Sequence, residues 1–340
     1  MEHEYEEKLE EPVSPIGQYF NSSSLCLYII AVLEFEVAIH DLQAFALLKD
    51  VFLPISPRFS SIMVHDKNEE KRWKRVDSSI IDDDKTPIRL GDDGADFQPI
   101  SISSIAFSID HIKDIKSKLG VTMNDVVTGI VFYGTRLYMQ EMDSKSKTSN
   151  STALVLLNTR NIEGYQSIDD MLNTKKSKGP WGNKISFLHV PIPKLNETRI
   201  LNPLDFIHDT HNIINRKKQS LAVALTGTLL EIEGKFRGQE AVAKHIRRTI
   251  TKSSAVVTNL VGPVQQMSLA NHPVKGLYFT LAGGPESLII SIMSYMGELR
   301  VTLKTEKDFI DEKRLKSCMQ SAFEIIHKAT MKLVVPHETN

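Results

Sequence analysis

Residues 121–142 run VTMNDVVTGIVFYGTRLYMQEM, and this stretch decides what kind of fold the chain can adopt. Thr122 and Asp125 have the spacing of a capping box with Asp in place of Glu, so we expect a helix that begins here and reaches about Met142. Its side chains are apolar on nearly every side. A helix that is apolar all round is buried, so the rest of the chain has to supply the layers that cover it.

Strands and helices are expected on both sides of this helix, and their mixed order predicts an α/β (mixed α+β) fold on a mostly mixed sheet. The helix after residue 109 is expected to have Asp110 as its N-cap and to stop at Gly120. The expected strands are 24–37 (buried), 104–109, 153–157, 185–190, 254–260, 274–280, 287–295 and 298–304, with a hairpin within 60–76. The expected helices are 39–53, 110–119, 122–142, 203–219, 221–233, 239–250 and 308–330.

The bulk composition narrows the function classes. The 340 residues are 41% hydrophobic and 24% charged, which is an ordinary globular composition. A formal net charge of -1 gives no field that attracts nucleic acid, so no nucleic-acid partner is expected. The two cysteines, Cys26 and Cys318, make no disulfide framework. No apolar run approaches the length of about 20 residues that crosses a bilayer, so any membrane contact is expected to be peripheral.

Several short motifs occur in a set order along the chain: EPVSP at 11–15, PRFSS at 57–61, Asn124-Asp125 within TMNDVVTG, NTR at 158–160, WGN at 181–183 and NLVGP at 259–263. Together these stretches resemble the plant wax ester synthase/diacylglycerol acyltransferase (WS/DGAT) family. The resemblance implies the CoA-dependent acyltransferase fold, which is chloramphenicol-acetyltransferase-like and has two lobes.

One family motif, His-His-x-x-x-Asp-Gly, is missing from this chain. No two of the 11 histidines are adjacent, and the Asp93-Gly94 pair follows Ile88 and Arg89 where the histidines would stand. In the family the second histidine of the motif removes the proton of the alcohol. We therefore expect an incomplete N-terminal lobe at 1–76, a linker at 77–99 and a C-terminal acyltransferase-like lobe at 100–340. An alternative splice form, a decayed gene copy and a mis-assembled gene model each give this pattern.

Two functions follow from these observations. By resemblance, the chain is an acyl-CoA-dependent O-acyltransferase that moves a long acyl chain to a long-chain alcohol or to diacylglycerol, giving wax esters and triacylglycerol. The alternative is a catalytically inactive truncated member that acts at most as a binding or partner protein. Acyl-CoA is a substrate, and no further cofactor is implied. The resemblance places the protein peripherally at the endoplasmic reticulum or plasma membrane, while the chain itself is also consistent with the cytosol.

No catalytic residue and no metal ligand is assigned from the sequence, because the motif is absent. By resemblance, Asn124 and Asp125 lie near the acyl-CoA tunnel, and the simpler interpretation is that they cap the buried helix. Asn259, with Gly262 and Pro263, is expected to shape a turn at the domain interface.

The histidines outside the motif are given structural interpretations. His208 and His211 have an i, i+3 spacing that a metal could use, but a solvated helix face is the favoured interpretation. Three further histidines are interpreted in the same way. His40 is expected near a helix start, His189 as a core residue in an apolar strand, and His272 in a turn.

Overall fold

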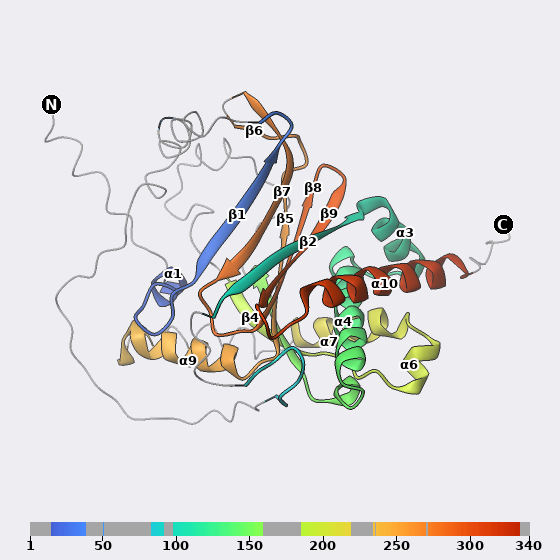
Figure 1. The fold of residues 1–340 in the computed structure, drawn as a ribbon, viewed down its shortest axis with the longest axis horizontal. Coiled ribbons are helices and arrows are strands. Elements are labelled where there is room, and N and C mark those ends of the chain that lie inside the picture. The colour runs from blue at the N-terminus through green and yellow to red at the C-terminus, as the bar shows by residue number, and fades with distance from the viewer. Residues whose placement is uncertain are drawn as a thin grey trace, which may run out of the picture.

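The computed structural model describes residues 15–38, 50, 83–91, 98–158, 185–218, 234, 236–269 and 271–333 (Figure 1). Within these ranges strands and helices alternate, which confirms the mixed α/β prediction. The elements are α1 (Pro15–Tyr19), β1 (Tyr28–Phe35), β2 (Ile100–Ser108), α3 (Ile109–Leu119), α4 (Met123–Met142), η5 (Ser146–Thr148), β3 (Thr152–Asn158), β4 (Ile185–Pro191), α6 (Glu197–Leu201), α7 (Asp205–Lys218), α9 (Gln239–Thr251), β5 (Ala255–Val261), β6 (Ser268–Leu269), β7 (His272–Ala282), β8 (Leu288–Tyr295), β9 (Glu298–Glu306) and α10 (Glu312–Met331).

A six-stranded sheet with the order β2-β9-β8-β5-β3-β4 forms the centre of the described structure. Its middle strands β3, β5 and β8 pair in parallel, while β2, β9 and β4 add antiparallel pairs toward the two edges. Parallel strands need helical crossovers, and those crossovers supply the covering layer.

Helices α3, α4, α7 and α10 cover one face of this sheet, as Figure 1 shows for the side nearest α4. Val126, Ile130 and Phe132 of α4 are each at most 1% exposed and belong to the largest core cluster. The prediction of a deeply buried helix at 122–142 is therefore confirmed. The capping box between Thr122 and Asp125 is also present.

The opposite face of the six-stranded sheet is covered by α9 and by a second sheet of order β1-β7-β6. β1 pairs antiparallel with β7 from Tyr28 opposite Ala282 to Phe35 opposite Val274. A strand near the N-terminus thus shares a sheet with a strand from the last quarter of the chain. The expectation of a buried strand at 24–37 is wrong, because every residue of β1 is at least partly exposed, with Tyr28 and Ile29 at 58% and 72%.

Residues 83–91, which fall in the segment expected to be a linker, are anchored to the rest of the fold. The buried Asp83 carboxylate accepts hydrogen bonds from the Thr152 backbone N–H at 2.6 Å and from the Ser254 hydroxyl at 2.7 Å. Ile88 is fully buried in the main core cluster. Residues 83–91 therefore pack against the core of the fold.

Details at the helix ends differ from the sequence-based expectation in one place. Helix α3 has Ser108 as its N-cap, and Asp110 lies in the first turn, where its charge still favours the helix dipole. Gly120 ends the helix in the left-handed conformation at φ 65°, as expected. The expected helix at 221–233, the hairpin within 60–76 and nearly all of the helix at 39–53 lie outside the described residues.

No helix in the described ranges has both the length and the apolar content needed to cross a bilayer. Cys26 and Cys318 are both free thiols, in keeping with the absence of a disulfide framework.

Candidate site at the start of helix α4

The first turn of α4 holds a buried carboxylate. Asp125 accepts hydrogen bonds at Oδ2 from the Thr122 backbone N–H at 3.0 Å and from the Thr122 hydroxyl at 2.7 Å. In return, the Asp125 backbone N–H donates to Thr122 Oγ1 at 3.2 Å. The side chain is 1% exposed. The capping box thus fixes the carboxylate as well as the helix start.

The same carboxylate contacts an imidazole from another helix. His211 Nδ1, on α7, lies 2.7 Å from Asp125 Oδ2, although the two residues are 86 positions apart. The His211 side chain is 29% exposed, so it joins a buried anion to the protein surface. The expectation that His211 lies on a solvated helix face is therefore wrong, because its ring is turned toward the start of α4.

The ionisation state of Asp125 follows from its surroundings. Burial raises the pKa of this carboxyl, but the hydrogen bonds from His211 and Thr122 outweigh burial and hold the pKa of Asp125 below its ordinary value. Asp125 is therefore a carboxylate at neutral pH. Since a carboxylate can only accept hydrogen bonds, the hydrogen between the two side chains is carried by His211 Nδ1.

Asn215 of α7 lies alongside the His211 ring. One turn further along the helix, it places Nδ2 at 3.0 Å from His211 Nε2 and at 3.3 Å from Nδ1. Because Nδ1 carries the hydrogen that faces Asp125, the neutral form of the ring has its lone pair on Nε2, on the side away from the carboxylate.

The approach of α7 to α4 depends on Gly129. A Cβ atom added at Gly129 would lie 2.9 Å from both the Cα and Cγ1 atoms of Ile207, closer than real Cβ atoms come. Ile207 is fully buried and lies one turn before His211 on α7. The missing side chain therefore lets the two helices pack closely enough for the imidazole to reach Asp125.

Asn124 and Asn259 meet beside this pair. The Asn259 amide, near the C-terminal end of β5, donates from Nδ2 to Asn124 Oδ1 at 2.9 Å. Asn124 precedes Asp125 in the first turn of α4. The structure thus brings together the three polar residues that the sequence singled out, and the interpretation of the Asn-Asp pair as a helix cap is confirmed for Asp125.

Gly262 and Pro263 follow β5 and have a structural role at its end. The Gly262 backbone N–H donates to Ser294 Oγ at 3.3 Å, and a Cβ at Gly262 would overlap the backbone carbonyl oxygen of Ser294. Glycine is therefore required by the close approach of two backbones. The turn continues into Pro263.

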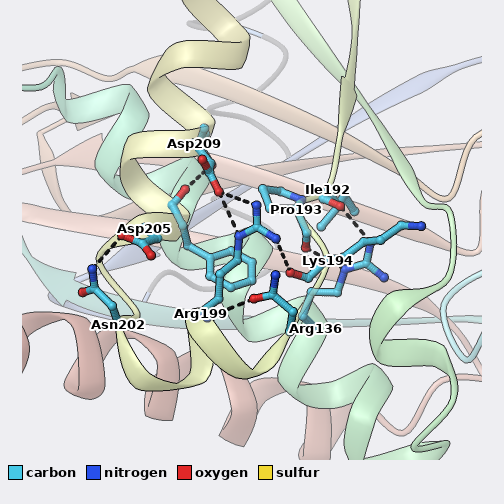
Figure 2. Close-up of polar contacts among 11 residues, drawn as sticks. Arg136, Ile192, Pro193, Lys194, Arg199, Asn202, Asp205 and Asp209 are labelled. Carbon is cyan, nitrogen blue, oxygen red and sulfur yellow. Dashed lines mark hydrogen bonds and ion pairs between the residues drawn. The ribbon is translucent and has the colours of Figure 1, made fainter.

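His208 and its neighbour Asp209 do not form a metal site with His211. The Asp209 carboxylate accepts from Arg199 Nε at 2.9 Å, and Arg199 Nη1 donates to the Lys194 carbonyl at 2.8 Å (Figure 2). His208 is exposed. Among the residues the structure describes, no three His, Cys, Asp or Glu side chains gather as metal ligands would.

Arg136, in the second half of α4, forms a separate buried group that the sequence did not reveal. Its guanidinium donates to the carbonyls of Pro193 at 2.9 Å, Ile192 at 2.7 Å and Ser146 at 3.2 Å. Figure 2 shows Arg136 beside the chain at Ile192 and Pro193. The side chain is fully buried, and burial lowers its pKa to about 10, so it stays charged at neutral pH.

His189 lies away from this site. The sequence predicted a core histidine in an apolar strand, but the side chain is exposed. Strand β4 is an edge strand, and its neighbours Leu188 and Val190 point into the core while His189 points out.

Comparison with known proteins relates part of this chain to a known domain family. Residues 181–327 match the family model of the WS/DGAT C-terminal domain. This match agrees with the family resemblance of the short motifs and with the mixed, CoA-dependent acyltransferase-like fold that the resemblance implies. The division at 1–76, 77–99 and 100–340 stays a prediction.

The similar proteins include plant and bacterial members of the family. Wax ester synthase/diacylglycerol acyltransferase 5 of Arabidopsis thaliana is 32% identical over 216 residues, which cover 60% of this chain and 42% of that protein. Number 4 of the same plant is 27% identical over 248 residues, 70% of this chain and 47% of that protein. The solved structure of the enzyme from Marinobacter aquaeolei VT8 is 12% identical, with a TM-score of 0.48, over 73% of this chain and 52% of that one. The chain spans about half the length of the curated relatives it matches.

Proposed function

We propose that this chain acts in acyl-CoA-dependent O-acyl transfer, with a long-chain acyl-CoA as donor and a long-chain alcohol or diacylglycerol as acceptor. The products are a wax ester or a triacylglycerol. The match of residues 181–327 to the WS/DGAT C-terminal domain carries this proposal. The names of the plant relatives state both activities, and both acceptors share a hydroxyl group as the attacking group.

The chemistry of the site supports the proposal. Ester formation requires that a base take the hydroxyl proton as the oxygen attacks the thioester carbonyl, and histidine is the side chain best suited to that at neutral pH. An imidazole oriented by a buried carboxylate is present at His211 and Asp125. The family's own histidine pair is absent from the sequence.

A second candidate function is favoured by that absence. Where the family motif would place its histidines, the chain has Ile88, which is fully buried, and Arg89, whose Nη2 donates to the Thr251 carbonyl at 3.1 Å. These two positions provide no base. A family member without a base would bind acyl-CoA or a protein partner without turning it over.

The cellular location is proposed from the substrates of the family. Both the acyl donor and the acceptors are lipids, so the chain would meet them by peripheral contact at the endoplasmic reticulum or the plasma membrane. The exposed apolar side chains Leu260, Val261 and Val264, which follow Asn259, are suited to such contact. Flotation of the purified protein with vesicles tests this part separately.

Incubation of the purified chain with a radiolabelled long-chain acyl-CoA and either hexadecanol or dioleoylglycerol tests the reaction itself. We expect labelled ester above a no-protein control, resolved by thin-layer chromatography as wax ester or triacylglycerol. Binding of acyl-CoA without ester from either acceptor would support the non-catalytic function and contradict acyl transfer.

A further inference from the structure

We propose that His211 Nε2 is the proton acceptor for the acceptor hydroxyl, an inference that rests on the proposed function and names the base for it. The structure provides three conditions for that role in one place. The ring is oriented by a buried carboxylate, the hydrogen on Nδ1 leaves the lone pair of the neutral ring on Nε2, and part of the ring reaches the surface.

Asp125 determines which nitrogen is basic. Its Oδ2 already accepts from the Thr122 N–H and hydroxyl, and it lies at 2.7 Å from His211 Nδ1. An acceptor with these neighbours requires the hydrogen on Nδ1, so the lone pair is on Nε2. As the ring gains a proton, the same carboxylate stabilises the imidazolium that forms, as in other carboxylate–histidine pairs.

Asn215 lies next to the nitrogen that would accept the proton. Its Nδ2 is 3.0 Å from His211 Nε2 and 3.3 Å from Nδ1, so the amide lies beside the ring. A substrate hydroxyl that approaches Nε2 has to displace this amide. Asn215 is itself half-buried on the surface side of α7, where it can turn away without disturbing the core.

The step balances without any further reagent. The hydroxyl hydrogen moves to His211 Nε2 while the alcohol oxygen forms a bond to the thioester carbonyl carbon. The carbon–sulfur bond then breaks, and the electron pair leaves with the CoA sulfur. The imidazolium returns its proton to that thiolate, so free CoA, the ester and the neutral histidine are the products.

The expected effects separate the roles of the residues. Loss of the base lowers turnover by about 10²–10⁴-fold. Asp125 is a positioning residue, so Asp125→Asn should lower kcat with little change in the KM for acyl-CoA. Asn215→Asp should lower activity, because a carboxylate beside Nε2 favours the protonated ring.

Ester formation is compared among the full chain, His211→Gln and His208→Gln. His208 is exposed on the same helix and serves as the matched control. We expect His211→Gln to lose at least about 10²-fold and His208→Gln to match the wild type. Undiminished ester formation by a folded His211→Gln protein would overturn the assignment while leaving the proposed function in place.

A second measurement decides the assignment if the wild-type chain forms no ester, which would count against the proposed function alone. Diethyl pyrocarbonate acylates the neutral, lone-pair nitrogen of accessible histidines, and peptide mass spectrometry gives a rate for each site. His211 should react faster than exposed His208 in the Asn215→Ala protein, and this advantage should vanish with Asp125→Asn. Equal rates at both histidines, with or without Asp125, would overturn the inference.

Discussion

The two halves of α4 hold their charges in opposite ways. At Arg136 the charge is fully buried, and the guanidinium donates to three backbone carbonyls, which cannot titrate. At Asp125 the charge is also buried, but one partner is the imidazole of His211, which is 29% exposed. The first arrangement fixes loops to a helix, and the second connects a buried charge to solvent.

The difference separates a structural charge from a chemically useful one. A buried ion whose partners are all fixed dipoles has one state at every ordinary pH and contributes to the uniqueness of the fold. A buried ion that faces a titratable group can exchange a proton with a ligand at the surface. The same helix provides both, so substitutions in its two halves should affect different properties.

The largest effect is expected at Arg136. Arg136→Ala leaves the carbonyls of Ile192, Pro193 and Ser146 buried without their donor and opens a cavity, so the free energy of unfolding should fall by about 3–5 kcal/mol. Urea denaturation measures this. Arg199→Ala is the matched control, because Arg199 is half-exposed and should cost under about 1 kcal/mol. Equal losses at both arginines would contradict the buried-anchor interpretation.

The next effect is expected at Asp125 and depends on pH. The folded pKa of Asp125 is below its unfolded value of about 3.9, so its stabilisation is fully present above that pH and is lost as pH falls through the folded pKa. Asp125→Asn should lower the free energy of unfolding by about 1.5–3 kcal/mol at pH 7. The gap between the two proteins should narrow below about pH 4. A gap of the same size at pH 7 and pH 3 would show that the charge of Asp125 is not what stabilises.

A smaller effect on stability, with a selective effect on the site, is expected at Gly129. Gly129→Ala forces Ile207 and α7 away, at a cost of about 1–3 kcal/mol, and should slow acylation of His211 by diethyl pyrocarbonate. Gly134→Ala is the control, since its Cβ would meet Met319 of α10 instead. If both alanines slowed His211 equally, the contact between α4 and α7 would not be what positions the ring.

The smallest effect is expected at Asn259. Its amide makes one hydrogen bond to Asn124 at 2.9 Å, so Asn259→Ala should lower the free energy of unfolding by about 0.5–1.5 kcal/mol. Thermal or urea unfolding measures the change, with Asn212→Ala, exposed on α7, as a surface control. A loss as large as that of Arg136→Ala would mean that Asn259 anchors the fold and does more than align the first turn of α4.

The sequence predicted the local features of α4 well, because they depend on close neighbours. The capping box of Thr122 and Asp125 and the buried face of Val126 and Ile130 follow from spacing within the helix. The stop of α3 at Gly120 follows from the conformational freedom of glycine. Each of these signals lies within a few residues of the feature it specifies.

Contacts between distant segments could not be predicted in the same way. Nothing in the residues around His211 indicates that its partner is Asp125, since the pairing depends on how α7 crosses α4 at Gly129. The role of Arg136 could not be predicted from the apolar pattern around it. Its partners are backbone carbonyls, which every residue has and which therefore leave no signal in the sequence. Only the three-dimensional arrangement identifies the candidate base.

The most direct measurement is the tautomer of His211, read from the imidazole nitrogen signals of protein labelled with 15N-histidine and assigned by their loss in His211→Gln. We predict that the neutral ring carries its hydrogen on Nδ1 and its lone pair on Nε2. We also predict a mixture of tautomers in Asp125→Asn. A ring that carries its hydrogen on Nε2, or one that Asp125→Asn leaves unchanged, would contradict this prediction.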